Sequence, residues 1–177
     1  MKKTARGFTL VELLVVIAII AILAAVVVLI INPLELMKRS RDAARLTDLA
    51  NLQTAINVAV QESTQSSQYI ACNTVAGDCT DKSTNNVTGY RGIDGNGWVK
   101  INFANQKSVS VPTLPIDPIN STAYHYTYCG NGETWRIETV LESDQQKPKM
   151  LADGGLSDTM YEVGSDMTTA VIATCTY

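Results

Sequence analysis

The sequence predicts an α+β protein, with a long N-terminal helix that carries a small antiparallel β-sheet head. Three observations support this fold class: a continuous apolar run over 13–31, an amphipathic stretch after it, and short strand patterns in the second half of the chain. We therefore divide the chain into four parts. They are a leader over 1–7, an apolar helix over 8–31, an amphipathic helix over 32–65 and a β-rich head over 66–177.

The apolar run is long enough to cross a bilayer, which takes about 20 residues at a rise of 1.5 Å each. Its many valines and isoleucines do not argue against a helix, because backbone groups in lipid must bond within their own segment. The run ends at Asn32-Pro33, where proline removes a helical hydrogen bond. A transmembrane helix with a break at Pro33 follows from this.

The stretch after Pro33 is polar, with a thin apolar stripe that predicts one buried helix face. The stripe consists of Leu49, Leu52, Ile56 and Val60, at spacings of three and four residues. We interpret it as the surface on which the head folds.

Strand patterns appear after an irregular polar region over 69–97. The candidate strands are 98–103, 124–128, 134–141 and 170–176, and Gly130-Asn131-Gly132 predicts a hairpin turn between the second and third. In the third, Trp135, Ile137, Thr139 and Leu141 alternate with Arg136 and Glu138. This alternation predicts one buried and one solvent-facing side.

Four cysteines follow the apolar run, and an even number in an exported segment indicates disulfides. Three pairings are possible. We favour Cys72–Cys79, which closes a short polar loop, and Cys129–Cys175, which ties the last candidate strand to an inner one.

Composition argues against several function classes. The formal net charge is −3, and no clustered basic face predicts a nucleic-acid partner. The one histidine, His125, lies between tyrosines in a strand pattern, and no catalytic motif accompanies it. We expect neither an enzyme nor a bound cofactor.

The segment Gly7-Phe8-Thr9-Leu10-Val11-Glu12 stands directly before the apolar run and after basic residues at Lys2, Lys3 and Arg6. These basic residues orient the N-terminus toward the cytoplasm. A secretory signal would place its cleavage site after a shorter apolar stretch. A plain membrane anchor would do better without Glu12, because an ionisable group at that depth is costly.

This segment resembles the class III signal of type IV prepilins and type II secretion pseudopilins. The resemblance implies cleavage after Gly7 by a prepilin peptidase, methylation of the Phe8 amine, and assembly through Phe8 and Glu12. It also implies a lollipop-shaped, single-pass precursor in the cytoplasmic membrane with its head outside. Assembly machinery in that membrane would then build an extracellular or periplasmic filament.

A second, looser similarity concerns calcium. The segment 114–120 is similar to the proline-flanked aspartate segment that precedes a tyrosine-rich strand in major pseudopilins, and Asp153-Gly154-Gly155 with Asp158 is similar to the acidic loop that binds calcium in those proteins. Calcium takes six to eight oxygen ligands, of which Asp144, Asp153 and Asp158 could supply some. A solvated polar loop is the alternative interpretation.

The sequence thus predicts a structural filament subunit. One alternative is a minor pilin with a priming, adhesive or DNA-binding role. Another is a membrane-anchored extracellular binding domain that never polymerises.

Overall fold

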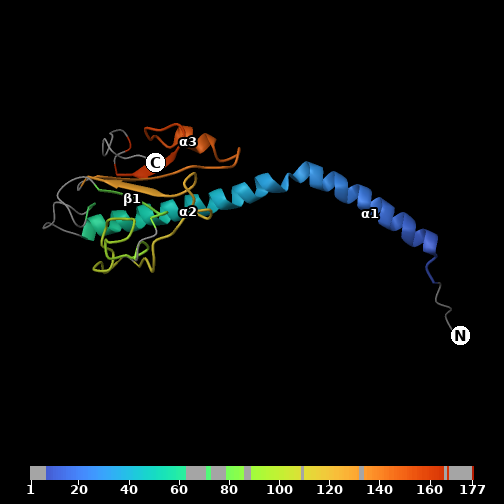
Figure 1. Ribbon diagram of the computed structural model, residues 1–177, viewed down its shortest axis with the longest axis horizontal. Helices are drawn as coiled ribbons and strands as arrows, with labels where there is room; N and C mark the ends of the chain where they lie inside the picture. The colour runs from blue at the N-terminus through green and yellow to red at the C-terminus, as the bar shows by residue number, and fades with distance from the viewer. Residues whose placement is uncertain are drawn as a thin grey trace. The chain divides into compact units, whose positions relative to one another are not determined.

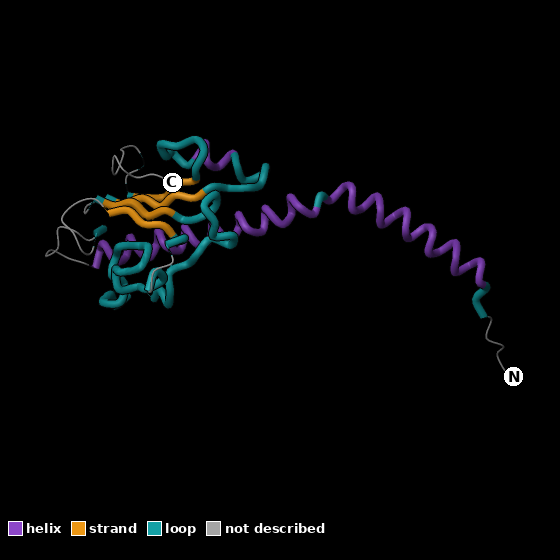
Figure 2. Tube along the Cα trace, in the orientation of Figure 1, coloured by secondary structure: helices purple, strands orange, loops and turns teal. Residues whose placement is uncertain are grey.

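The computed structural model describes residues 7–62, 71–72, 79–85, 89–108, 110–131, 134–165, 167 and 177. The chain forms two compact units, Met1–Met37 and Lys38–Tyr177, and each is described by itself. Figures 1 and 2 show a helical N-terminal part and a head in which strands, loops and a helix pack together.

The first unit is dominated by the helix α1 (Leu10–Ile31). Its stretch Leu10–Val28 is long and apolar enough to cross a membrane and is not buried anywhere. Asn32 ends the helix with a left-handed backbone at φ 44°, a conformation that asparagine tolerates better than most residues. Helix α2 (Pro33–Glu62) begins immediately after, so the predicted break at Asn32-Pro33 is confirmed.

The second unit contains an antiparallel sheet of four strands in the order β1-β2-β3-β4. The strands are β1 (Cys79–Lys82), β2 (Thr127–Gly130), β3 (Trp135–Thr139) and β4 (Tyr161–Gly164). A short helix, α3 (Pro148–Ala152), lies between β3 and β4 in the chain. The predicted α+β class is confirmed.

One core joins α2 to the sheet. Leu49, Leu52 and Ile56 are buried as predicted, whereas Val60 is 37% exposed and that prediction is wrong. Ala59 takes the buried place, because a seven-residue step from Leu52 returns to the same face of the helix. The strands contribute Tyr128, Trp135, Ile137 and Val163 to this core, and Tyr126, which directly precedes β2, packs with them.

The predicted hairpin between β2 and β3 is confirmed. Gly130 pairs with Trp135, and the Asn131 side chain accepts a hydrogen bond from the Thr134 amide at 2.8 Å. An asparagine that bonds the backbone beyond it is a common way to close such a turn.

The predicted strand at 98–103 is wrong. This segment runs as bends, with a single bridge between Asp94 and Asn102. Trp98 is held by a 2.8 Å bond from its amide to Tyr90 O and a 2.9 Å bond from Nε1 to Pro115 O. The apolar residues therefore fill the core from an irregular loop.

Two strands lie where none was predicted. The short strand β1 falls inside the predicted loop, and β4 follows a region without a strand pattern. The candidate strand at 170–176 lies outside the described residues.

The predicted solvent-facing side of β3 is also wrong, because Arg136 is 6% and Glu138 2% exposed. Arg136 Nη2 lies 2.7 Å from Glu138 Oε1, and Arg136 Nε lies 3.1 Å from Glu162 on the neighbouring strand. The loop before β4 folds onto this cluster, and the Ser157 amide donates to Glu162 at 2.7 Å. Charged residues can thus be buried here because they bond one another.

The Cys72–Cys79 disulfide is confirmed. It lies beside Ala71, whose carbonyl accepts a 2.7 Å hydrogen bond from the buried Tyr128 hydroxyl. Cys129 is buried and takes part in a disulfide. Its predicted pairing with Cys175 stays a prediction, because Cys175 lies outside the described residues.

A fully buried guanidinium, that of Arg45, joins α2 to two distant loops. It donates to Asp42 on its own helix at 2.8 Å, to Asp117 at 3.0 Å, and to Glu142. Glu142 also receives two hydrogen bonds from Arg41, at 2.6 and 2.8 Å. This Arg45 network, made of Arg41, Asp42, Arg45, Asp117 and Glu142, ties segments about 100 residues apart in the chain.

Hydrogen bonds within the network favour the charged forms of Arg45 and Glu142. Burial alone would disfavour a charged Arg45, but hydrogen bonds to Asp117 and Glu142 outweigh it and raise the pKa of the guanidinium. The hydrogen bond from Arg41, with help from Arg45, lowers the pKa of Glu142 against the opposing effect of burial.

A pH-dependent loss of stability follows. Because the pKa of Glu142 is lowered, the stability from its charge is present above the ordinary carboxyl pKa of about 4.3. It is lost as the pH falls through the lower value of the folded state. Glu142→Gln should cost about 1.5–3 kcal/mol at pH 7, and the difference from wild type should shrink below pH 4. Urea unfolding at several pH values measures this, and a difference that stays constant with pH would contradict it.

The Cys129–Cys175 prediction is tested by peptide mapping without reductant. A linked peptide pair is expected, and Cys129→Ser should lower the unfolding free energy of the head by about 2–4 kcal/mol. A free Cys129 thiol, or a bond to Cys72, would refute the pairing.

Candidate functional site

The segment before α1 is the candidate processing site. Phe8 is 84% exposed, and Gly7 lies in irregular backbone without a positive φ. A Cβ added at Gly7 would meet nothing within 4 Å. The fold therefore does not require glycine at this position.

Thr9 and Glu12 form a capping box at the start of α1. The Glu12 amide donates to Thr9 Oγ1 at 3.2 Å, and the Thr9 amide donates to Glu12 Oε2 at 2.8 Å. The Thr9 hydroxyl adds a 2.9 Å bond to the same carboxylate oxygen. Sequence analysis missed this arrangement, although a threonine with glutamate three residues later is its usual signature.

The capping box joins Glu12 to the backbone directly after Phe8. Thr9 N–H belongs to the peptide bond that follows Phe8, and Glu12 binds it directly. A carboxylate here is also favoured by the positive end of the helix dipole. Cleavage after Gly7 would create an amine one residue from the group that Glu12 already holds.

Beyond this turn, α1 presents an apolar surface all around. Phe8, Leu10 and most of the larger apolar residues after them are between 47% and 84% exposed. Such a surface needs lipid or other protein around it. The predicted membrane-spanning segment is therefore present, by length and composition, in the described part of the chain.

The calcium candidates lie in different settings. Asp144 pairs with Lys147 at 3.1 Å, and Asp158 is exposed in a turn. Asp153 accepts hydrogen bonds from the Gly155 and Glu162 amides, both at 2.8 Å. Within the described ranges, no three His, Cys, Asp or Glu side chains are grouped to hold a metal. Calcium binding stays a prediction.

His125 is a packed residue. It is 2% exposed, stacks on the Tyr177 ring with centroids 4.1 Å apart, and has Nδ1 3.1 Å from Ser121 O. Burial lowers the pKa of its imidazole. These contacts fit a structural role and leave it poorly placed to reach a substrate.

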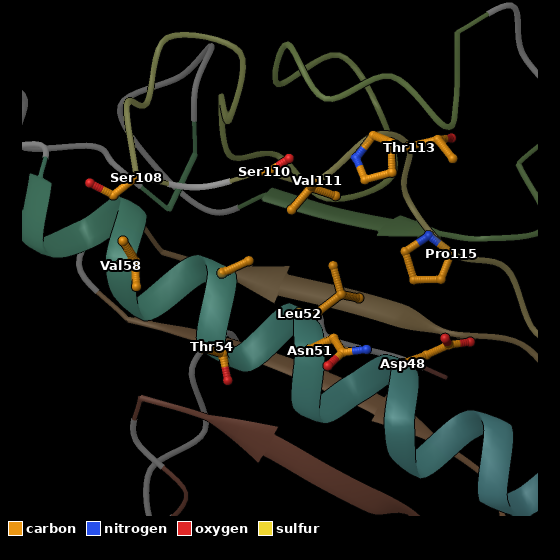
Figure 3. Close-up of a pocket in the computed structure, with 12 residues that line it drawn as sticks. Asp48, Asn51, Leu52, Thr54, Val58, Ser108, Ser110, Val111, Thr113 and Pro115 are labelled. Atoms are coloured by element: carbon orange, nitrogen blue, oxygen red, sulfur yellow. The ribbon is translucent and has the colours of Figure 1, made fainter.

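A groove of about 460 Å³, which the sequence did not indicate, runs between α2 and the segment 108–115 (Figure 3). The helix contributes Asp48, Asn51, Leu52, Thr54, Ala55 and Val58, and the segment contributes Ser108, Ser110, Val111, Pro112, Thr113 and Pro115. We call it the α2 groove. Its lining mixes apolar and polar side chains.

Comparison with known proteins bears on the N-terminal site. Residues 2–28 match a family model described as the prokaryotic N-terminal methylation motif. Neither the curated proteins nor the solved structures gave a match. The matched stretch covers Gly7, Phe8, Glu12 and most of α1, and it leaves the head outside.

Substitution of Gly7 separates processing from folding. Because an added Cβ meets nothing within 4 Å, Gly7→Val should fold and insert as wild type does, but retain residues 1–7. Gly7→Ala is the conservative control and should be cleaved more efficiently than Gly7→Val. Mass spectrometry of the membrane protein reads the N-terminus directly. A wild-type N-terminus other than Phe8 would refute the cleavage site.

Proposed function

We propose that this chain, which carries the class III signal of type IV pilin and pseudopilin precursors, is a structural subunit of a filament. The filament would be a type IV pilus-like fibre or a type II secretion pseudopilus. The observation that carries the proposal is Glu12, held beside Phe8 at the N-terminus of an exposed apolar helix.

The precursor would begin as a single-pass protein of the cytoplasmic membrane. Lys2, Lys3 and Arg6 would stay on the cytoplasmic side, and the head would lie outside. A prepilin peptidase would then cut after Gly7 and leave Phe8 as the N-terminus, whose amine would be methylated. Assembly machinery in the same membrane would move the subunit from lipid into an extracellular or periplasmic filament.

Helix α1 would form the filament core. Lipid is as apolar as a neighbouring helix, so the hydrophobic effect alone gives no preference for the filament. A polar contact that exists only between correctly placed helices can supply that preference. A buried ion pair is best supported as a device that sets register, and Glu12 with the Phe8 amine fits this use.

The capping box leaves room for such a pair. Thr9 donates both of its hydrogen bonds to Oε2 of Glu12, so Oε1 can accept the amine of the same or a neighbouring subunit. Glu12 would thus stabilise the first turn of α1 and bind the new N-terminus at once.

A minor pilin is the second candidate, with a priming, adhesive or DNA-binding role. The α2 groove is the feature of the head that would serve such a binding role. A non-polymerising, membrane-anchored binding domain is the third. Abundance separates the candidates: a major subunit dominates sheared filaments, a minor pilin is present in traces, and an anchored domain is missing from them. Proteins with this motif are structural, which agrees with the absence of a catalytic motif in the sequence.

The central test substitutes Glu12. Glu12→Ala removes a charge from the edge of the apolar run, so insertion and cleavage should be kept. Assembly should fall at least about tenfold, since losing one partner of a buried pair typically costs 3–5 kcal/mol. Glu12→Gln keeps the shape and a hydrogen-bonding group but removes the ion, and it should also assemble poorly.

The measurement is the ratio of filament protein to membrane protein for wild type, Glu12→Ala and Glu12→Gln. Thr9→Ala is the matched control, because it weakens the helix cap and leaves the carboxylate in place. Equal ratios for wild type, Glu12→Ala and Glu12→Gln would remove the basis of the proposed function.

A further inference from the structure

His125 and Tyr177 are in contact although they lie 52 positions apart in the chain. Their rings stack with centroids 4.1 Å apart and an interplanar angle of 19°. The Tyr177 hydroxyl accepts a hydrogen bond from the His125 amide at 3.0 Å, and it lies 3.2 Å from His125 O and 3.3 Å from Ala123 O. One side chain thus covers the imidazole and bonds the backbone that carries it.

The imidazole is hydrogen-bonded on one side. Nδ1 lies 3.1 Å from Ser121 O, and because a carbonyl only accepts, Nδ1 carries the hydrogen of the neutral ring. Nε2 is then an acceptor. It is buried and has no hydrogen-bond partner within the part of the chain that the structure describes. A proton on Nε2 would therefore create a buried, charged donor without an acceptor, which is costly.

The charged groups around the ring do not offset this cost. Burial lowers the pKa of the imidazole, and the positive charge of Lys82 on β1 adds to the effect. Asp117 acts in the opposite direction, but its carboxylate already accepts two hydrogen bonds from Arg45. On the side of β3, the nearest polar group is the uncharged Thr139 hydroxyl, which donates to His125 O at 3.2 Å.

The Tyr177 ring gives a protonated imidazole only partial compensation. A cation stacked on an aromatic ring gains a cation–π contact. This gain is smaller than the hydration that a charged group loses when it is buried without a hydrogen-bond partner. Displacement of Tyr177 would admit water, which supplies the missing acceptor. Protonation of His125 therefore favours separation of the two rings.

We propose that His125 and Tyr177 form an acid-sensitive latch in the head: neutral His125 holds Tyr177 in place, and a proton on Nε2 releases it. Because folding lowers the pKa of the imidazole, the contact contributes its full stability above the ordinary value of about 6.5. The contribution decreases as the pH falls from there toward the lower pKa of the folded head. The latch concerns the head alone and does not rest on the proposed filament function.

NMR of the imidazole tests the latch directly, because His125 is the one histidine in the sequence. The full chain in detergent micelles carries isotope-labelled histidine, and the ring shifts are followed from well above to well below about pH 6.5. We expect the wild-type imidazole to titrate below that value and to lose the ring-current shift from Tyr177 in the same step. In Tyr177→Leu, which lacks the ring and the hydroxyl, the imidazole should titrate nearer its ordinary value.

Two results of this titration would overturn the inference. One is a ring-current shift that persists in the protonated wild type, because the contact would then tolerate the charge. The other is an identical titration in wild type and Tyr177→Leu, because Tyr177 would then have no influence on the proton.

Hydrogen exchange at the His125 amide gives a second test, since this amide bonds the Tyr177 hydroxyl. Corrected for the intrinsic rate, it should exchange about tenfold or more faster at pH 5 than at pH 7, because a one-proton equilibrium shifts by about tenfold per pH unit. His125→Phe is the matched variant: it keeps an aromatic ring for the stack but binds no proton, so its protection should not change with pH.

The Ile137 amide on β3 is the internal control, and it should stay protected at both pH values in both chains. This separates local release of Tyr177 from unfolding of the whole head. Equal protection of the wild-type His125 amide at pH 5 and pH 7 would refute the latch. A loss of protection that His125→Phe shares would refute it as well, since that variant has no imidazole.

Discussion

The head depends on one interaction, the burial of Arg45 among carboxylates. A guanidinium with no exposed surface is costly unless every donor is used, and here Asp42, Asp117 and Glu142 accept from it. Two of these acids also accept from backbone amides: Asp42 from Ser143 at 2.7 Å, and Asp117 from Ile119 at 2.8 Å. The Tyr124 ring covers the guanidinium, with its centroid 5.1 Å from Cζ. The network mainly fixes the positions of the loops around α2, because a loop that shifted would leave one of the buried charges unpaired.

The N-terminal site differs from the head, because contacts within the chain do not account for most of its residues. The fold leaves Gly7 in open space and the sides of α1 uncovered. Only Glu12 is engaged, through Thr9. Gly7 and the uncovered surface of α1, which contacts within the chain do not explain, fall in the stretch that matches the methylation motif.

Sequence reasoning succeeded where short-range sequence patterns determine the structure. Length and composition defined α1, proline marked its end, and a turn sequence marked the β2–β3 hairpin. It failed where tertiary partners decide. Alternation predicted a solvent-facing side for Arg136 and Glu138 because it cannot reveal Glu162, which is distant in sequence but lies on the neighbouring strand. Trp98 read as a strand residue because its partner, Pro115 O, lies 17 residues away. The capping box could have been read from Thr9 and Glu12, whereas the α2 groove could not, since its walls come from separate segments.

The Cys72–Cys79 bond affects in which compartment the head can reach its full stability. It fixes the residue next to Ala71, whose carbonyl is the hydrogen-bond partner of the Tyr128 hydroxyl in the core. A buried hydroxyl without its acceptor costs about 1–3 kcal/mol. Cytoplasmic thiols stay reduced, so a head kept under reducing conditions would lack both the crosslink and a firmly held acceptor. Oxidation would thus act as a checkpoint, because a head becomes fully stable only in the compartment where disulfides form.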